Sequence, residues 1–121
     1  METRAFPCTN DGAIGARAFL EVVCDSPKAA IVLDEIVSNI VRCSGASTFR
    51  VGVGQTSEGL TMAFSDDGKP FDPTRDVREP DVTASIDERG IGGLGIFMVK
   101  KMAKSVTYRR DADRNVLTVQ L

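Results

Sequence analysis

One stretch of this chain has so regular an apolar pattern that it constrains the fold more than any other feature. Apolar residues recur in pairs four positions apart, at Ile31, Val32, Leu33, Ile36, Val37, Ile40 and Val41. This is the period of a helix with one buried face. Ser26 and Pro27 are typical of a helix start, with the serine as cap and the proline in the first turn. Gly45 suits a left-handed helix end, so we predict a core helix from Pro27 to just before Gly45.

A second helix and a first strand are predicted before this core helix, from weaker signals. Residues 3–9 fit a strand, and Asn10 or Asp11 is expected to cap a helix that runs to about Cys24. The apolar residues at helical spacing, which we expect to form the buried face of this helix, are Ile14, Ala18, Phe19 and Val22.

The second half of the chain has the patterns of two hairpins and a third helix. Apolar and polar residues alternate over 48–56 and again over 60–65, and a second alternating pair turns at 111–115. Between the hairpins, the polar stretch 67–92 predicts a long loop, and a helix is expected over about 93–104. The order helix, helix, hairpin, loop, helix, hairpin predicts an α+β fold with helices on one face of a largely antiparallel sheet.

Composition excludes several classes of function. A chain of 121 residues is expected to form a single domain, 1–121, and its net charge of −2 gives no general attraction to nucleic acid or anionic membranes. The N-terminus lacks the apolar core of a signal peptide, and the three cysteines follow no metal-binding or disulfide pattern, so we expect a cytoplasmic protein. The absence of histidine from the sequence excludes Ser-His-Asp chemistry and histidine-based zinc sites.

Glu35 and Asn39 stand on the polar side of the core helix. Their spacing of four residues places both side chains on one helix face, one turn apart. A carboxylate and an amide oxygen so placed suit a hard cation that holds phosphates. Alternatively, the carboxylate takes a proton from water or a hydroxyl while the amide holds the metal. Taken alone, the pair fits a solvated helix face better, because most polar helix faces have no such role.

Asp66 ends a predicted strand and is followed by Asp67 and Gly68. A carboxylate there can accept a hydrogen bond from the exocyclic amine of a base, and glycine lets a ligand approach the backbone. An ordinary Asp-Asp-Gly turn has the same pattern. Phe71 favours the binding interpretation, because a phenylalanine followed by a rigid Asp-Pro exit is unusual in a simple hairpin.

The segment 90–95 matches G-x-G-x-x-G, but not in the context of a Rossmann fold. That fingerprint must follow a buried parallel strand, whereas residues 83–89 are polar. No Gly-Lys-Ser/Thr follows, which excludes a Walker A loop. Free amides at a helix start predict phosphate binding at four consecutive residues, Gly92, Gly93, Leu94 and Gly95. A hinge is the alternative, but four glycines in six residues cost backbone entropy that a hinge does not need.

In this order, the segments resemble those of the GHKL (Bergerat-fold) ATPases and, within them, the stand-alone anti-sigma factor serine kinases. Residues 33–39 resemble the N box of the family, 66–73 its first glycine box and 92–99 its second. Residues 115–118 resemble the closing strand. The resemblance extends from about Ala29 to the C-terminus.

The resemblance implies a two-layer sandwich, in which a mixed, mostly antiparallel sheet of about four or five strands is covered on one face by three helices. It also implies a site for ATP or ADP with Mg²⁺. By similarity, Glu35 would be the general base and Asn39 the Mg²⁺ ligand. Asp66 would recognise the adenine amine with Gly68 beside it, and residues 74–91 would form a lid.

Family members of this size phosphorylate a serine or threonine of a small anti-anti-sigma (STAS-type) partner and bind a sigma factor, often as homodimers. The resemblance therefore implies a cytoplasmic ATP-dependent protein serine/threonine kinase, and Arg17 as a residue that contacts a partner. A nucleotide-gated protein-binding module without kinase activity is the alternative. A detached catalytic domain of a sensor kinase would need a partner to supply the histidine.

Overall fold

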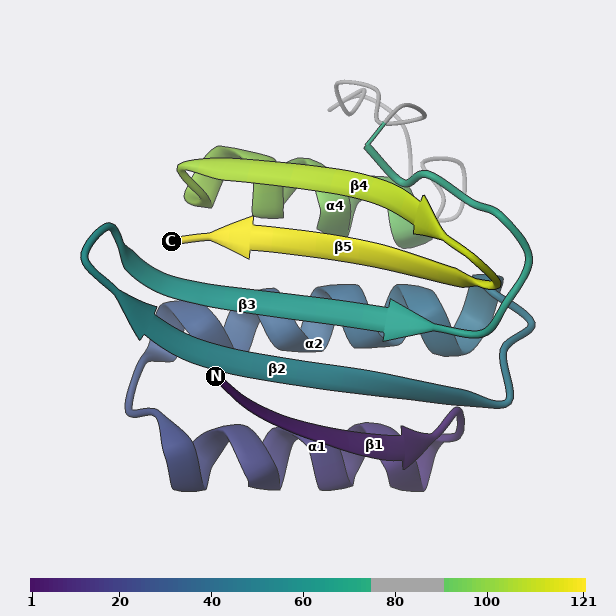
Figure 1. Ribbon diagram of the computed structural model, residues 1–121, viewed down its shortest axis with the longest axis horizontal. Coiled ribbons are helices and arrows are strands. Elements are labelled where there is room, and N and C mark those ends of the chain that lie inside the picture. Colours follow the sequence, from purple (N-terminus) through teal and green to yellow (C-terminus); the bar gives the residue numbers. More distant parts are fainter. Residues whose placement is uncertain (75–90) are drawn as a thin grey trace.

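In the part of the chain that the structure describes, the helices α1, α2 and α4 all lie on one face of the sheet (Figure 1). The computed structural model describes residues 1–74 and 91–121. Within them the sheet has five strands in the order β1-β2-β3-β5-β4, and every neighbouring pair is antiparallel. The strands are β1 (Glu2–Pro7), β2 (Thr48–Thr56), β3 (Gly59–Asp66), β4 (Ser105–Asp111) and β5 (Arg114–Gln120). The predicted α+β architecture is confirmed, although the sheet is antiparallel throughout rather than mixed.

The core helix follows its sequence signals closely. It is α2 (Pro27–Cys43), and the Ser26 side chain accepts a hydrogen bond from the Ala29 N–H at 3.1 Å. Gly45 has a φ of +68°, the left-handed conformation expected beyond a helix end. The apolar face of α2 packs on a core from alternate strand positions, formed by Phe49, Val51, Met62, Phe64, Leu117 and Val119.

The first helix, α1 (Asn10–Val23), begins with a different cap from the predicted one. The Thr9 side chain accepts a hydrogen bond from the Gly12 N–H at 3.1 Å, so neither Asn10 nor Asp11 is the cap. The strand before it ends at Pro7 rather than at residue 9. This early end leaves Cys8 and Thr9 to make the connection.

The predicted buried face of α1 is wrong in three of its four positions, and only Phe19 is buried as expected. Ile14 is 68% exposed, Val22 is 85% exposed and Ala18 is also exposed. The residues that face the core are Gly12, Ala16, Phe19 and Leu20. The reason is the close approach of α1 to the end of β1. A Cβ on Gly12 would overlap the carbonyl oxygen of Pro7, so only glycine fits there. The close approach at Gly12 therefore determines which face of α1 packs against the core, and the spacing of the apolar residues alone does not.

The third helix in the described residues is α4 (Ile91–Met102), which covers the β4–β5 side of the sheet (Figure 1). It begins two residues before the predicted start at 93 and ends two before 104. The predicted lid, 74–91, lies outside the described residues except for its two ends. No helix within residues 1–74 and 91–121 has both the length and the apolar character to cross a bilayer.

Candidate functional site

A pocket lies between α2, the sheet and the segment that follows β3. Its apolar walls come from Ile36, Ile40, Phe64, Ile96 and Leu117, and its polar lining from Asn39, Ser44, Asp66, Tyr108 and Asn115. A few polar groups converging in an apolar pocket are typical of a small-molecule site. The pocket therefore joins residues from the core helix, both hairpins and α4.

The cavity in this pocket is narrow, about 30 Å³, which is room for a water molecule or two. Two of its walls, Phe71 and Pro73, are half-buried side chains on an irregular segment. These side chains can move without disrupting a helix or strand, unlike the walls on α2 and the sheet. A purine-sized ligand therefore requires Phe71 and Pro73 to move outward.

Asp66 is the last residue of β3 and is only 5% exposed. Its Oδ1 accepts hydrogen bonds from the Gly68 N–H at 2.9 Å and from Nδ2 of Asn115 at 3.0 Å. Its Oδ2 accepts no hydrogen bond from residues 1–74 or 91–121. A buried carboxylate whose second oxygen lacks a protein donor is suited to accept one from a ligand amine.

Gly68 packs closely on the end of α2. A Cβ on Gly68 would overlap the carbonyl oxygen of Ser44 and lie 2.9 Å from Oδ1 of Asp66. Lys69 continues this contact, because its N–H donates to the same Ser44 oxygen at 3.2 Å. The space beside Gly68 is thus filled by Ser44, and the glycine is needed for this packing rather than for the approach of a ligand.

Asp67 has a separate, structural role beside Asp66. Its Oδ1 accepts hydrogen bonds from the N–H groups of Ser47 and Thr48, and its Oδ2 accepts one from the Ser47 hydroxyl at 2.7 Å. The bonds from the Ser47 hydroxyl and the Thr48 backbone lower the pKa of Asp67 to about 2. The two neighbouring carboxylates therefore have different roles: Asp66 lines the pocket, and Asp67 holds the start of β2.

Asn39 lies one turn beyond Glu35 on α2, as predicted, and lines the pocket. It is 8% exposed, and its side-chain amide makes no hydrogen bond to any residue in the described ranges. A buried amide without a protein partner is costly unless another group satisfies it. The amide borders the cavity, so water, a metal or a ligand there can satisfy it.

Glu35 meets the second glycine-rich segment directly. A Cβ on Gly95 would lie 3.1 Å from Cδ of Glu35 and closer still to its Oε2. Gly95 therefore has a use that the sequence did not reveal, since the missing side chain admits the carboxylate against α4. Gly95 is the fifth residue of α4. Its N–H group is therefore expected to pair within the helix, unlike the first four N–H groups, which are free to bind phosphate.

The other predicted phosphate-binding residues, Gly92, Gly93 and Leu94, fall in the first turn of α4. The first four N–H groups of a helix have no partner within it, and the helix dipole favours an anion there. The residues that follow this turn reach the site, because Gly95 contacts Glu35 and Ile96 lines the pocket. The structure thus brings Asn39, Asp66 and Phe71 to one pocket, and α4 reaches the same pocket through Ile96.

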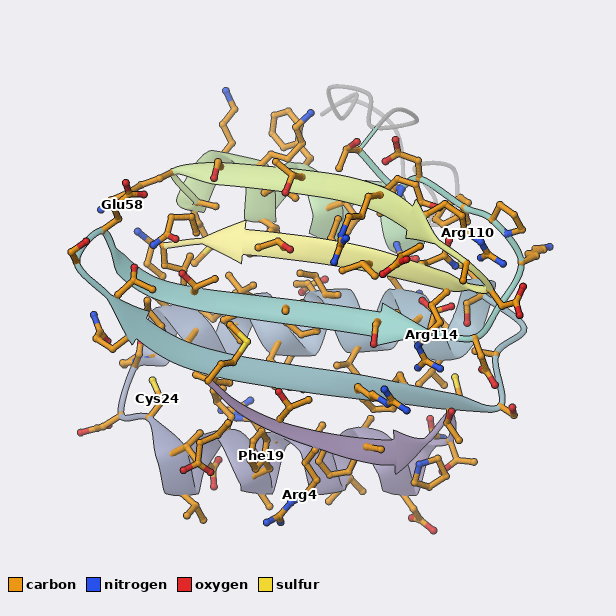
Figure 2. The ribbon with its side chains drawn as sticks, viewed as in Figure 1. Arg4, Phe19, Cys24, Glu58, Arg110 and Arg114 are labelled. Atoms are coloured by element: carbon orange, nitrogen blue, oxygen red, sulfur yellow. The ribbon has the colours of Figure 1, made fainter. Side chains whose placement is uncertain are left out.

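Sequence reasoning missed Asn115 as a site residue. It is the second residue of β5, 6% exposed, and is paired with Asp66 across the β3–β5 ladder. Arg110 donates to both Asn115 and the Gly68 carbonyl, and lies at the end of the sheet where the β4–β5 hairpin turns (Figure 2). The only sequence signal for Asn115 was its place at the start of the closing strand.

Arg17, which the resemblance suggested as a partner contact, is engaged within the protein. Its Nε lies 3.3 Å from Oε1 of Glu21, and its Nη1 donates to Asp34 on α2. The pair with Asp34 ties α1 to α2 on the exposed side of the helix pair, whereas the pair with Glu21 lies within α1.

Comparisons with known proteins agree with this fold. A family model described as the histidine kinase-like ATPase domain matches residues 15–121. Among solved structures, the histidine kinase AdeS of Acinetobacter baumannii superposes with a TM-score of 0.58 and 16% sequence identity over 98% of this chain. This chain spans 66% of the length of that structure, and at this identity the likeness shows the fold alone. No curated protein matches the sequence significantly.

The family match, together with the fold, defines a GHKL-type ATP-binding domain. The chain belongs to the histidine kinase-like ATPase domain family.

Proposed function

We propose that this protein is a cytoplasmic ATP-dependent protein kinase of the anti-sigma factor type. It transfers phosphate to a serine or threonine of a small anti-anti-sigma partner, and it binds a sigma factor. The observation that carries the proposal is the contact between Glu35 and Gly95, because it brings a carboxylate beside the residue that follows the first turn of α4, the turn best suited to hold phosphates. Asn39 lies on the same face of α2, one turn away.

The residues of the pocket fit a nucleotide with its metal. Asp66 would accept a hydrogen bond from the base amine, and the first turn of α4 would receive the phosphates. No cluster of three or more His, Cys, Asp or Glu suited to a metal occurs within residues 1–74 and 91–121. Asn39 would offer its amide oxygen to Mg²⁺, with phosphate oxygens and water as the other ligands. When bound, Mg²⁺ would neutralise charge on the transferring phosphate.

Glu35 would act as the general base in this reaction. It is half-buried on α2, one turn before the pocket residue Asn39, and its contact with Gly95 restrains where its carboxylate lies. There it would accept the proton of the partner's hydroxyl as phosphate is transferred. The sequence has no histidine, so it contains no acceptor of the kind that histidine kinases use.

The test is transfer of label from ATP to purified candidate partners of the anti-anti-sigma type. Serine and threonine phosphates survive acid and are lost in strong base, whereas phosphohistidine is lost in acid. Acid-stable label on the partner, absent when its acceptor serine or threonine is replaced by alanine, supports the proposal. Acid-labile label would overturn the assignment to serine or threonine. ATP binding without transfer to any partner would favour a nucleotide-gated binding module.

A further inference from the structure

Asn115 uses its whole hydrogen-bonding capacity within the protein. Its Nδ2 donates to Oδ1 of Asp66 at 3.0 Å and to the carbonyl oxygen of Lys69 at 2.8 Å. Its Oδ1 accepts from three groups: the Phe71 N–H at 3.2 Å, the Tyr108 hydroxyl at 2.5 Å and Nη1 of Arg110 at 3.2 Å. A primary amide has two donors and one acceptor oxygen, so Asn115 keeps no group for a ligand.

The same bonds fix the orientation of Asp66. Its Oδ1 already accepts from both Asn115 and the Gly68 N–H, so rotation of the carboxylate would break two buried hydrogen bonds. This leaves Oδ2 as the oxygen available to a ligand, and an ionised carboxylate can only accept. The pocket is thereby restricted to a ligand that presents an N–H donor at this point.

We propose that Asn115 is a positioning residue that makes the pocket selective for a purine with an exocyclic amine. It acts through Asp66 and does not touch the base. The inference rests on the proposed nucleotide site and deepens it. The same amide holds the backbone at Lys69 and Phe71, so it also places the Phe71 wall of the pocket relative to Asp66.

The first experiment compares the affinity of the full chain for ATP with that for the triphosphate of purine riboside, which lacks the 6-amino group. The wild type should prefer ATP by roughly tenfold to a hundredfold, the size of one hydrogen bond to a charged group. Asn115→Ala should reduce this preference to about twofold or less, because a free Asp66 carboxylate can turn away. Affinity for the amine-free analogue should fall much less than affinity for ATP.

The matched control is Gln120→Ala, at the other end of the same strand. The Gln120 amide also joins neighbouring segments, accepting from the Thr61 hydroxyl and donating to the carbonyls of Glu58 and Leu60. Its loss should lower the melting temperature and leave the preference for ATP unchanged. The control thus separates a general weakening of β5 from a loss of selectivity.

Asn115→Asp is an isosteric test. If Asn115 orients Asp66, the selectivity of this variant for ATP should depend on pH, which a purely structural role would not produce. The introduced carboxylate can still accept from Tyr108 and Arg110, but when ionised it repels Asp66 instead of donating to it. Two carboxylates that share one site cannot both stay ionised as the pH is lowered, and the proton that the pair takes up restores a donor between them. Selectivity for ATP, measured relative to wild type at each pH, should therefore recover. Cys8, Tyr108 and Arg110 are the other titratable groups near the pair.

The outcomes separate the two proposals. If wild type binds ATP with the stated preference and folded Asn115→Ala keeps it, the positioning role is wrong and the nucleotide site stands. If Asn115→Ala does not fold, Asn115→Asp decides: selectivity independent of pH overturns the role. If wild type binds neither triphosphate, both the proposed nucleotide site and the positioning role of Asn115 are wrong.

Discussion

The two ends of the pocket hold their polar groups in different ways. At the base end, defined by Asp66, Gly68 and Asn115, the side chains are bonded to one another and to the backbone. At the phosphate end, defined by Glu35, Asn39 and the first turn of α4, the Asn39 amide has no hydrogen bond to the described residues. Glu35 is located there by contact with Gly95.

This difference indicates which property of the site each end of the pocket controls. A network that is satisfied within the protein has its geometry fixed before a ligand arrives, so it is suited to select among ligands. Groups without protein partners gain theirs from the ligand, so they are suited to hold a metal and to take part in transfer. Changes at the phosphate end should therefore alter transfer and metal dependence while leaving base selectivity unchanged.

The largest effect is expected for Glu35→Gln. If Glu35 is the base, phosphate transfer should fall by about a hundredfold to ten-thousandfold, because the amide cannot take the proton. ATP affinity and the preference for an aminopurine should stay near wild type. The measurement is single-turnover transfer to the partner beside equilibrium binding of ATP. Asp34→Asn, an adjacent carboxylate paired with Arg17, is the control. Transfer at the wild-type rate in Glu35→Gln would remove the proposed base.

Gly95→Ala should separate activity from stability. Alanine is favoured over glycine inside a helix by about 1 kcal/mol, and the atom it would meet is the movable end of Glu35. The melting temperature should therefore stay the same or rise. Displacement of the carboxylate should lower transfer by up to about a hundredfold, the cost of an ångström-scale misplacement.

The control for this change is Gly15→Ala, in α1 and far from the pocket in the chain. A Cβ there would lie 3.3 Å from the Phe6 ring, so it also adds a methyl group in a close helical contact. This variant should transfer phosphate as wild type does. A Gly95→Ala protein with full transfer would show that the contact with Glu35 has no bearing on activity.

A smaller effect is expected for Asn39→Ala. Wild-type affinity for ATP should tighten when Mg²⁺ is added, and the variant should lose about tenfold of that tightening, the size of one charge-assisted contact. Affinity without Mg²⁺ should change little, as should the preference for an aminopurine. The measurement is a nucleotide titration with and without the metal. Ser38→Ala, the preceding residue on α2, is the control, and an equal metal response in Asn39→Ala would contradict the assignment.

The sequence predicted those parts of the molecule that depend on local pattern. The cap of α2 at Ser26, the strand over 48–56 and the place of Asp66 at a strand end follow from nearest neighbours in the chain. The ordered segments also predicted that Asn39, Asp66 and the start of α4 would meet.

The parts that escaped prediction depend on contacts between distant segments. Asn115 faces Asp66 only because β5 pairs with β3 in one register, and no local pattern specifies that pairing. The inner face of α1 depends on how closely Gly12 approaches Pro7. Likewise, nothing near Gly95 in the sequence indicates that a carboxylate of α2 occupies the space of its missing side chain.

The smallest effect concerns Asp67, which supports the base end without lining the pocket. Its folded pKa of about 2 lies below the ordinary 3.8, so its contribution to stability is present above about pH 4 and is lost as the pH falls toward 2. Asp67→Asn keeps an oxygen for the N–H groups of Ser47 and Thr48 but removes the charge. The urea midpoint of wild type should therefore fall more steeply than that of the variant between pH 4 and pH 2.

Near neutral pH, ATP selectivity should be the same in both, because Asp67 bonds to the start of β2 and not to Asp66 or Asn115. Parallel acid profiles would mean that the charge of Asp67 adds nothing, and altered selectivity would mean that the base end extends further than Asp66, Gly68 and Asn115.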